Sequence, residues 1–378
     1  MKVMIVVTHL LGTGHLARAL TLGHAFAAAG HEVLIASGGR PAPHLDRGGL
    51  GWLQLPPLAS DGVDFTRLLT DRGEEADAAW LDARITALRE GLTAFAPDVL
   101  ITELFPFGRR SLSGEFLALL ETARDMRRRP VVLASIRDIL APPSKPKKAA
   151  RAEEIVTAFY DAVLVHSDPA ATTLDISWPL TPALTRKLRY TGYVAPPAPA
   201  PHPTGEGQGE VLVSAGGGAV GDPIFETALA TARLRPDLSW RLLVGGGDPE
   251  RLAALRHAAP ANARVEPARP DFRQMLPAAR ASVSMCGYNT AMDLLQAGTP
   301  AVLVPFDAGK EVEQGLRAAS LARLPGISLL PAADLDAAAL ATALDRVIAA
   351  GPRQGSALRF DGAARSVAIA SEMAEAGR

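Results

Sequence analysis

The fold is constrained most strongly by an alternation of short apolar strands and amphipathic helices that runs through most of this 378-residue chain. Its first cycle comprises an apolar strand at Val3–Val7, a turn at Thr8–Gly14, a helix at His15–Ala29 and a strand at Glu32–Ala36. Two strands joined through a helix in this way form a βαβ unit, whose strands pair in parallel. The sequence therefore predicts an α/β protein with doubly wound parallel sheets.

The alternation occurs in two blocks. In the first, further strands are predicted at 98–102, 131–135, 162–166 and 189–191, and further helices at 78–94, 111–126 and 151–160. In the second, strands are predicted at 210–214, 240–244, 263–266, 281–285 and 300–304, and helices at 222–233, 249–258, 271–279 and 289–297. Residues 194–209 between the blocks are dense in Pro and Gly, which predicts a semi-rigid linker, with a long surface loop inside one domain as the alternative.

The two blocks predict two Rossmann-like domains, at 1–193 and 210–357, and a C-terminal helix at 358–378 that packs back on the first domain. Ligands of such sheets bind at the carboxyl ends of the strands. The expected site is therefore the cleft between the domains.

Composition and charge exclude several classes of protein. The 39 basic and 40 acidic residues give a net charge of −1, so no nucleic acid partner is expected. The single cysteine, Cys286, excludes an intramolecular disulfide and a cysteine-rich zinc site. The opening residues are typical of a strand rather than a signal peptide, and no uncharged apolar run reaches the ~20 residues that span a bilayer. We expect a cytoplasmic protein, with peripheral membrane contact left open.

The first glycine loop, Gly12-Thr13-Gly14-His15-Leu16-Ala17-Arg18, partly matches a dinucleotide fingerprint. The acid that should bind a ribose is poorly placed, because Glu32 begins its strand instead of ending it. His15 stands at a helix N-terminus, where the dipole disfavours the protonated ring and leaves the imidazole available as a base. We interpret His15 as a candidate catalytic residue, with a capping or core histidine as the alternative.

Two further loops indicate phosphate binding. Gly216, Gly217 and Gly218 follow the strand at 210–214, where backbone amides can approach a phosphate, but the Gly-Lys-Ser/Thr ending of a P-loop is absent. In the second loop, Gly287, Tyr288, Asn289 and Thr290 lead into a helix. We expect Asn289 and Thr290 to cap this helix, its free amides to hold a diphosphate, and Asp293 to bind the hydroxyls of a ribose.

Charged residues near strand ends in the first domain are the remaining candidates. Glu103 follows the strand at 98–102 and competes with His15 as the base. Arg109 or Arg137 is suited to hold an anionic ligand bidentately, with a structural ion-pair network as the alternative. The basic run at 145–148 predicts a solvated loop, with contact to anionic lipid head groups as the lesser alternative. No motif indicates a bound metal.

Along its whole length the chain resembles the GT-B glycosyltransferases, and among them glycosyltransferase family 28. The resemblance is carried by the glycine loop at 12–15, by the segment 287–306 with its Gly-Thr-Pro and Val-Pro-Phe ending, and by Glu313, Gln314 and Arg317. Family 28 includes the cell-wall transferase that adds N-acetylglucosamine from UDP to a lipid-linked muramoyl peptide. The stretches 102–110 and 135–138 also look like those of a bacterial group of predicted glycosyltransferases.

The resemblance implies roles for these residues. Gly14, Gly216–Gly218 and Gly287–Thr290 would hold the diphosphate of the donor, Asp293 its ribose, and Glu313 and Gln314 its sugar. Arg109 and Arg137 would hold the acceptor. Asp293 stands where the family usually has Glu, and Tyr288 and Cys286 stand where small residues are common, so the fitting nucleotide is open.

We therefore predict an inverting, metal-independent GT-B glycosyltransferase without a cofactor. It would move a sugar from a nucleoside-diphosphate sugar, UDP favoured, to the hydroxyl of a small-molecule, lipid-linked or glycan acceptor. Two alternatives remain: a UDP-sugar hydrolase in which His15 activates water, and a non-catalytic nucleotide-sugar-binding protein. A dehydrogenase is less favoured, because the first loop lacks the ribose-binding acid.

Overall fold

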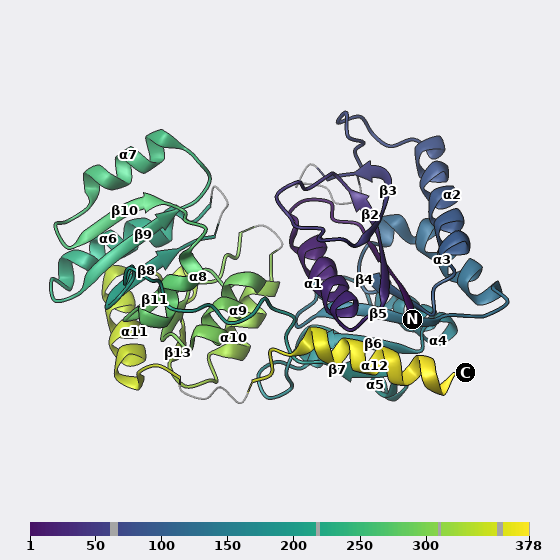
Figure 1. The fold of residues 1–378 in the computed structure, drawn as a ribbon. Coiled ribbons are helices and arrows are strands. Elements are labelled where there is room, and N and C mark those ends of the chain that lie inside the picture. The colour runs from purple at the N-terminus through teal and green to yellow at the C-terminus, as the bar shows by residue number, and fades with distance from the viewer. Residues whose placement is uncertain (61–66, 217–219, 309–310, 354–357, 378) are drawn as a thin grey trace. The chain divides into compact units, whose positions relative to one another are not determined.

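The computed structural model describes residues 1–60, 67–216, 220–308, 311–353 and 358–377 (Figure 1). It divides the chain into two compact units. Unit 1 comprises Met1–Pro169, Thr173–Pro196 and Arg359–Arg378, and unit 2 comprises Ala170–Thr172 and Pro197–Leu358. Each unit contains one parallel sheet with helices, so the predicted α/β fold class is confirmed.

The sheet of unit 1 has the strand order β3-β2-β1-β4-β5-β6-β7. All of its paired strands are parallel. The strands are β1 (Lys2–Val7), β2 (Glu32–Gly39), β3 (Gly51–Leu58), β4 (Val99–Glu103), β5 (Val131–Arg137), β6 (Ala162–His166) and β7 (Leu188–Tyr190).

Helices cover both faces of this sheet because alternate residues of its strands are apolar on both sides. Met4 and Val6 of β1 belong to one buried cluster with residues of the helices α2, α3 and α4, whereas Val3, Ile5 and Val7 belong to another with residues of α1 and α12. The helices are α1 (Gly14–Ala28), α2 (Ala78–Phe95), α3 (Ser113–Asp125), α4 (Pro146–Phe159), α5 (Pro182–Lys187) and α12 (Gly362–Ala376).

The sheet of unit 2 has the order β10-β9-β8-β11-β12-β13, again with parallel pairs. Its strands are β8 (Glu210–Ser214), β9 (Ser239–Val244), β10 (Ala263–Pro267), β11 (Ala281–Ser284), β12 (Ala301–Leu303) and β13 (Ile327–Leu329). Its helices are α6 (Asp222–Leu234), α7 (Pro249–Ala258), α8 (Phe272–Met275), α9 (Tyr288–Ala297), α10 (Glu313–Leu321) and α11 (Ala337–Ala350). One buried apolar cluster joins the sheet to α6 and α11.

Several elements differ from the sequence analysis, including the short helix α5, which was not predicted. The edge strand β3 was not predicted, because Pro56 and Pro57 interrupt its pattern; an edge strand tolerates proline, since one side of it needs no hydrogen bonds. The three-residue edge strand β13 was missed because it is too short to show a pattern. The basic run at 145–148 is not a loop, because α4 begins at Pro146 and places Lys147 and Lys148 in its first turn.

The segment predicted as a linker is joined to unit 2 by hydrogen bonds at several points. The backbone N–H of His202 donates to the carbonyl of Gln274, and its ring lies 3.0 Å from Asp271. The N–H of Gly209 donates to the carbonyl of Ala278. The chain passes from unit 1 to unit 2 between Pro196 and Pro197.

Both sheets reverse their strand order at the point where ligands of such sheets bind. This switch point lies between β1 and β4 in unit 1 and between β8 and β11 in unit 2. The loops that follow these four strands therefore define where a functional site is expected in each unit. No helix in the described part of the chain is long and apolar enough to cross a membrane.

Candidate active site

His15 stands in the first turn of α1, directly after the loop that follows β1. The N-cap residue Thr13 makes no capping hydrogen bond, and a Cβ added at Gly14 would meet no atom within 4 Å, so the start of the helix is open. Nδ1 of His15 lies 3.0 Å from Oε1 of Glu103, the last residue of β4. The structure thus joins two candidate catalytic residues that are 88 positions apart in the sequence.

Glu103 differs from its sequence-based expectation, because it does not face an open cleft. Only 1% of its side chain is exposed, since it forms an ion pair with Arg18 of α1 and accepts a hydrogen bond from the hydroxyl of Ser135 at 2.6 Å. Burial alone would raise the pKa of Glu103, but the charge of Arg18 and the hydrogen bonds from His15 and Arg18 hold that pKa well below its usual range. The carboxylate is ionised and positions its neighbours.

The ionised Glu103 favours one tautomer of His15. A carboxylate only accepts hydrogen bonds, so the contact with Glu103 favours a ring proton on Nδ1 that donates to Oε1. Nη2 of Arg18, which can only donate, lies 3.1 Å from the same Nδ1 and opposes this assignment. In the tautomer that Glu103 favours, Nε2 keeps its lone pair, makes no hydrogen bond within the described residues, and belongs to a side chain that is 17% exposed. Burial lowers the pKa of His15 to about 3, so the ring is neutral at neutral pH.

A second layer of buried polar residues lies behind Glu103. The Ser135 oxygen on β5 lies 2.9 Å from Nε2 of His166, the last residue of β6, and Nδ1 of His166 lies 2.9 Å from the hydroxyl of Thr191. Burial lowers the pKa of His166 to about 3, so this ring is neutral and donates from one nitrogen while it accepts at the other. The sequence analysis did not identify these residues as part of the site. The feature that could have indicated them is the occurrence of polar side chains near the ends of the adjacent strands β5 and β6.

Three arginines lie in this region of unit 1. Besides Arg18, Arg109 lies on the loop after β4 and donates from Nε to the carbonyl of Thr8 at 2.7 Å, while Arg137 ends β5. Burial and the charges of Arg137 and Arg18 lower the pKa of Arg109 to about 10 against the opposing effect of Glu103, so Arg109 stays cationic at neutral pH. Arg109, one of the two predicted acceptor-binding residues, therefore lies near Glu103 and near Arg137, the other one.

The loop that carries Arg109 has an unusual backbone. Leu104 and Arg109 have φ values of 69° and 57°, in the left-handed region that L-residues other than glycine rarely adopt. Such conformations cost about 1–2 kcal/mol per residue and concentrate at functional sites. The backbone of the loop after β4 therefore departs from local preference at both Leu104 and Arg109.

In unit 2, the start of α9 is open. Gly287 occupies the N-cap position, no side chain caps the helix, and a Cβ added at Gly287 would meet no atom within 4 Å. The prediction that Asn289 and Thr290 cap the helix is wrong, because α9 begins at Tyr288 and places both inside its first turn. Since first-turn amides have no partner within a helix, they and the helix dipole remain available to an anion.

Other helices of unit 2 have their first amides occupied by carboxylates. Asp248 accepts from two amides of α7, and Asp336 accepts from the amide of Ala339 in α11. Glu311 accepts from the amides of Glu313 and Gln314 at the start of α10. Among these four helices, α9 alone has a start without such a carboxylate within the described residues, which makes it the best-suited to a diphosphate.

The glycine loop after β8 is less suited to an anion. Gly216 has φ +80° and open space around the missing Cβ, whereas Gly217 and Gly218 lie outside the described residues. The helix that follows begins with Asp222, whose carboxylate pairs with Arg251. A carboxylate in the first turn opposes a second anion at the same helix start.

Asp293 lies within the second turn of α9 and already has a partner. Its Oδ1 accepts from Nε of Arg273 at 2.6 Å, and Arg273 also donates to Gln296 at 2.9 Å. Burial raises the pKa of Asp293, although Arg273 opposes that shift. With 15% of its side chain exposed, Asp293 is held in one position at the edge of the site. The sequence analysis did not identify Arg273.

Gln314 connects the two loops that flank the start of α9. Its Oε1 accepts from the backbone N–H groups of Cys286, at 3.1 Å, and Phe306, at 3.2 Å. Since the carbonyl is occupied, the side-chain NH₂ group is what Gln314 can offer to a sugar hydroxyl. The buried Arg317 strengthens the same connection by donating to the carbonyl of Cys286 at 3.1 Å. No group of three or more His, Cys, Asp or Glu among the described residues could hold a metal ion.

Comparison with known proteins gives the same class. Residues 226–364 match the glycosyltransferase family 28 C-terminal domain. An uncharacterized glycosyltransferase of Methanosarcina acetivorans is 24% identical over 333 residues, which cover 83% of this chain and 82% of that protein. The UDP-N-acetylglucosamine–N-acetylmuramyl-(pentapeptide) pyrophosphoryl-undecaprenol N-acetylglucosamine transferase of Rhizobium rhizogenes is 29% identical over 134 residues, 34% of this chain and 36% of that protein.

A solved structure matches over nearly the whole chain. The MurG structure from Acinetobacter baumannii superposes with a TM-score of 0.65 and 14% identity, over 98% of this chain and 99% of that one. This likeness establishes the fold. The protein is a GT-B glycosyltransferase, an enzyme that transfers sugars. Within that class, residues 226–364, most of which lie in unit 2, are similar to the glycosyltransferase family 28 C-terminal domain.

Proposed function

We propose that the protein is an inverting transferase in which His15 is the general base. Nε2 of His15 takes the proton from the acceptor hydroxyl as that oxygen attacks the anomeric carbon of the donor sugar. The bond from this carbon to the diphosphate breaks on the opposite side, so a single displacement inverts the configuration. The geometry that supports this role is the 3.0 Å contact between Nδ1 and the ionised Glu103, which leaves Nε2 unprotonated and stabilises the imidazolium that forms.

The donor in this proposal is a nucleoside-diphosphate sugar held by unit 2. The uncapped start of α9, from Gly287 to Thr290, binds the diphosphate, and Asp293 accepts hydrogen bonds from the ribose. Gln314 donates to the sugar from its NH₂ group, and Glu313 accepts from it. We favour UDP as the nucleotide, because the Rhizobium rhizogenes relative is named as a transferase acting with UDP-N-acetylglucosamine.

The leaving diphosphate requires neither a metal nor a cofactor in this proposal. Negative charge develops on its bridging oxygen as the bond to the sugar breaks. Backbone amides and the dipole at the start of α9 lie where that charge appears and need no rearrangement to stabilise it. This is the chemistry that a divalent cation supplies in other sugar transferases.

The acceptor is assigned to unit 1. Arg109 and Arg137 are cationic and partly exposed beside the cluster of His15 and Glu103, and Arg109 is fixed by its bond to the Thr8 carbonyl. Guanidinium groups bind carboxylates and phosphates bidentately. An acceptor that carries an anionic group and a free hydroxyl fits this arrangement.

The test is product analysis with the wild-type enzyme and a panel of UDP-, dTDP- and GDP-sugars. Without an acceptor we expect nucleotide binding with little release of free sugar. Rapid release of sugar and nucleotide into water would instead identify a hydrolase in which His15 activates water. When a sugar acceptor is found, proton NMR of the new linkage should show the anomeric configuration opposite to that of the donor; retention would exclude the single displacement.

A further inference from the structure

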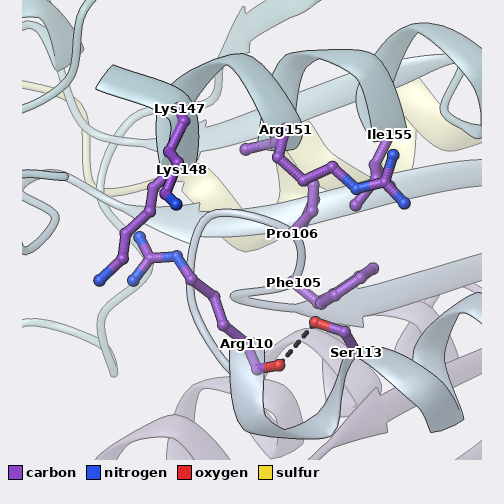
Figure 2. Close-up of a pocket in the computed structure, with 9 residues that line it drawn as sticks. Phe105, Pro106, Arg110, Ser113, Lys147, Lys148, Arg151 and Ile155 are labelled. Carbon is purple, nitrogen blue, oxygen red and sulfur yellow. Dashed lines mark hydrogen bonds between the residues drawn. The ribbon is translucent and has the colours of Figure 1, made fainter. Parts of the chain in front are cut away.

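A pocket of about 280 Å³ opens in unit 1 between the loop after β4 and the first half of α4 (Figure 2). Its floor is formed by buried apolar residues, among them Phe105, Pro106 and Ile155. Its rim carries the cations Arg110, Lys147, Lys148 and Arg151, and no lining residue is acidic. The pocket therefore combines a small apolar surface with four positive charges.

These cations have little compensation from carboxylates. Arg151 pairs with the exposed Glu154 at 3.0 Å, whereas Lys148 donates to the hydroxyl of Ser144 and Arg110 donates to the carbonyl of Phe107. Burial lowers the pKa of Arg110, and no acid opposes that shift. Figure 2 shows the side chains of Arg110, Lys147 and Lys148 on one side of the pocket and that of Arg151 on the other.

The start of α4 increases the positive charge instead of balancing it. The first turn contains no acid, its N-cap residue Lys145 makes no capping hydrogen bond, and two of its residues are lysines. Cations near a helix N-terminus are unfavourable, because the dipole already places about half a positive charge there. An anion bound beside these lysines would offset that cost.

We propose that this pocket binds a phosphate-bearing ligand, with the phosphate against Arg110, Lys147 and Lys148 and an apolar group against Phe105 and Ile155. The volume lies slightly below that of typical small-molecule sites, so it suits a mono- or diphosphate group with a short apolar neighbour and excludes an entire nucleotide sugar. This site is separate from the start of α9 and does not depend on the proposed transfer reaction.

The first test is calorimetric titration of the full-length protein with inorganic pyrophosphate as the probe. The double variant Arg110→Gln/Lys147→Gln should lose one binding event, or bind at least about ten-fold more weakly, because it removes two charge-assisted contacts. The control Arg127→Gln/Arg186→Gln removes the same charge from exposed positions of unit 1 outside the pocket and should bind like wild type. Equal binding by the pocket variant and wild type, or no binding by wild type together with a negative vesicle arm, overturns the proposal.

A second arm distinguishes a soluble phosphate from a lipid head group. Co-sedimentation is measured with phosphatidylcholine vesicles that contain or lack phosphatidic acid. Binding to the anionic vesicles that the pocket variant loses and the control retains identifies a phospholipid head group as the source. Pyrophosphate binding without vesicle binding identifies a soluble phosphorylated compound. Circular dichroism of both double variants confirms that they are folded; vesicle binding that both lose equally would reflect net charge alone and contradict the site.

Discussion

Unit 1 and unit 2 have the same strand order through their first six strands but carry different chemistry at their switch points. In unit 1, the loops after β1 and β4 bring together ionisable side chains, above all His15, Arg18 and Glu103. In unit 2, the loop after β11 presents glycine and backbone amides at an uncapped helix start. The difference matches the tasks: a proton needs a titratable group held in one protonation state, whereas a diphosphate needs several fixed donors without a competing carboxylate.

The comparison also explains where each unit tolerates substitution. The cluster in unit 1 is buried, so its charges are interdependent, and the loss of one leaves another unpaired. The backbone amides in unit 2 are kept by every substitution except proline, so most substitutions change only their supports, such as Asp293 and Gln314. We therefore expect substitutions in unit 1 to affect catalysis and stability, and those in unit 2 to affect donor affinity.

The largest effect is expected for His15→Gln, which removes the proposed base and keeps a similar volume. The rate of transfer should fall by roughly 10²–10⁴-fold, the usual contribution of a general base, while donor affinity stays unchanged. Turnover of a donor that wild type uses measures this, with His257→Gln on α7 as an exposed control. Wild-type turnover by the His15→Gln enzyme would show that His15 is not the general base.

Glu103→Gln should have the largest effect on stability. It leaves the buried Arg18 guanidinium without its counter-charge, and breaking a buried ion pair costs about 3–5 kcal/mol. Urea unfolding followed by circular dichroism measures the change. The exposed pair of Arg151 and Glu154 provides the control, since Glu154→Gln should change the unfolding free energy by less than about 1 kcal/mol. Equal effects would mean that Glu103 is not ionised in the folded protein.

The pH dependence of stability should reflect the buried His166. The pKa of His166 is about 3 in the folded protein and about 6.5 in the unfolded chain. Between pH 6.5 and pH 3 the unfolded chain therefore binds a proton that the folded protein does not. The free energy of unfolding falls as the pH falls through this range. Between pH 7 and pH 5 this one ring costs about 2 kcal/mol. His166→Gln should show a correspondingly smaller loss in urea unfolding at the two pH values. An unchanged difference would indicate that the ring is protonated in the folded state.

A smaller effect is expected for Asp293→Asn. It retains the shape of the side chain but removes the charge that pairs with Arg273 and weakens the acceptor for ribose hydroxyls. Donor affinity should fall about ten-fold, equivalent to about 1.4 kcal/mol. Stabilisation of the protein by UDP in a thermal melt measures this, with Asp345→Asn at an exposed ion pair of unit 2 as the control. An unaltered UDP-induced shift would place the ribose elsewhere.

Local patterns predicted much of the fold, whereas the partners of Glu103 depend on long-range contacts. The strands β6 and β8 have the bounds that their apolar runs predict, and the glycine loop leading to His15 is apparent in the sequence. The partners of Glu103 are not apparent, because Arg18 is 85 residues away from it and Ser135 is 32 residues away. The role of Glu103 depended on these partners, which turn an expected base into a buried positioning group.

The start of α9 shows that a prediction from a local pattern can also be wrong. Asn289 and Thr290 are good capping residues, and their position before an apolar helix predicted a cap. The helix begins earlier because Gly287 adopts the extended N-cap conformation, with φ −62° and ψ 153°. Because the N-cap residue is Gly287 and not Asn289 or Thr290, no side chain occupies the first amides of α9. These amides therefore remain available to a ligand.

The division of labour between the units is tested most directly by calorimetric titration of UDP into wild type, His15→Gln and Asp293→Asn. The account predicts that wild type and His15→Gln bind UDP with the same affinity, because the base lies in unit 1 and the donor site in unit 2. It predicts weaker binding by Asp293→Asn alone. Loss of UDP binding in His15→Gln with full binding in Asp293→Asn would contradict the account and place the donor in unit 1.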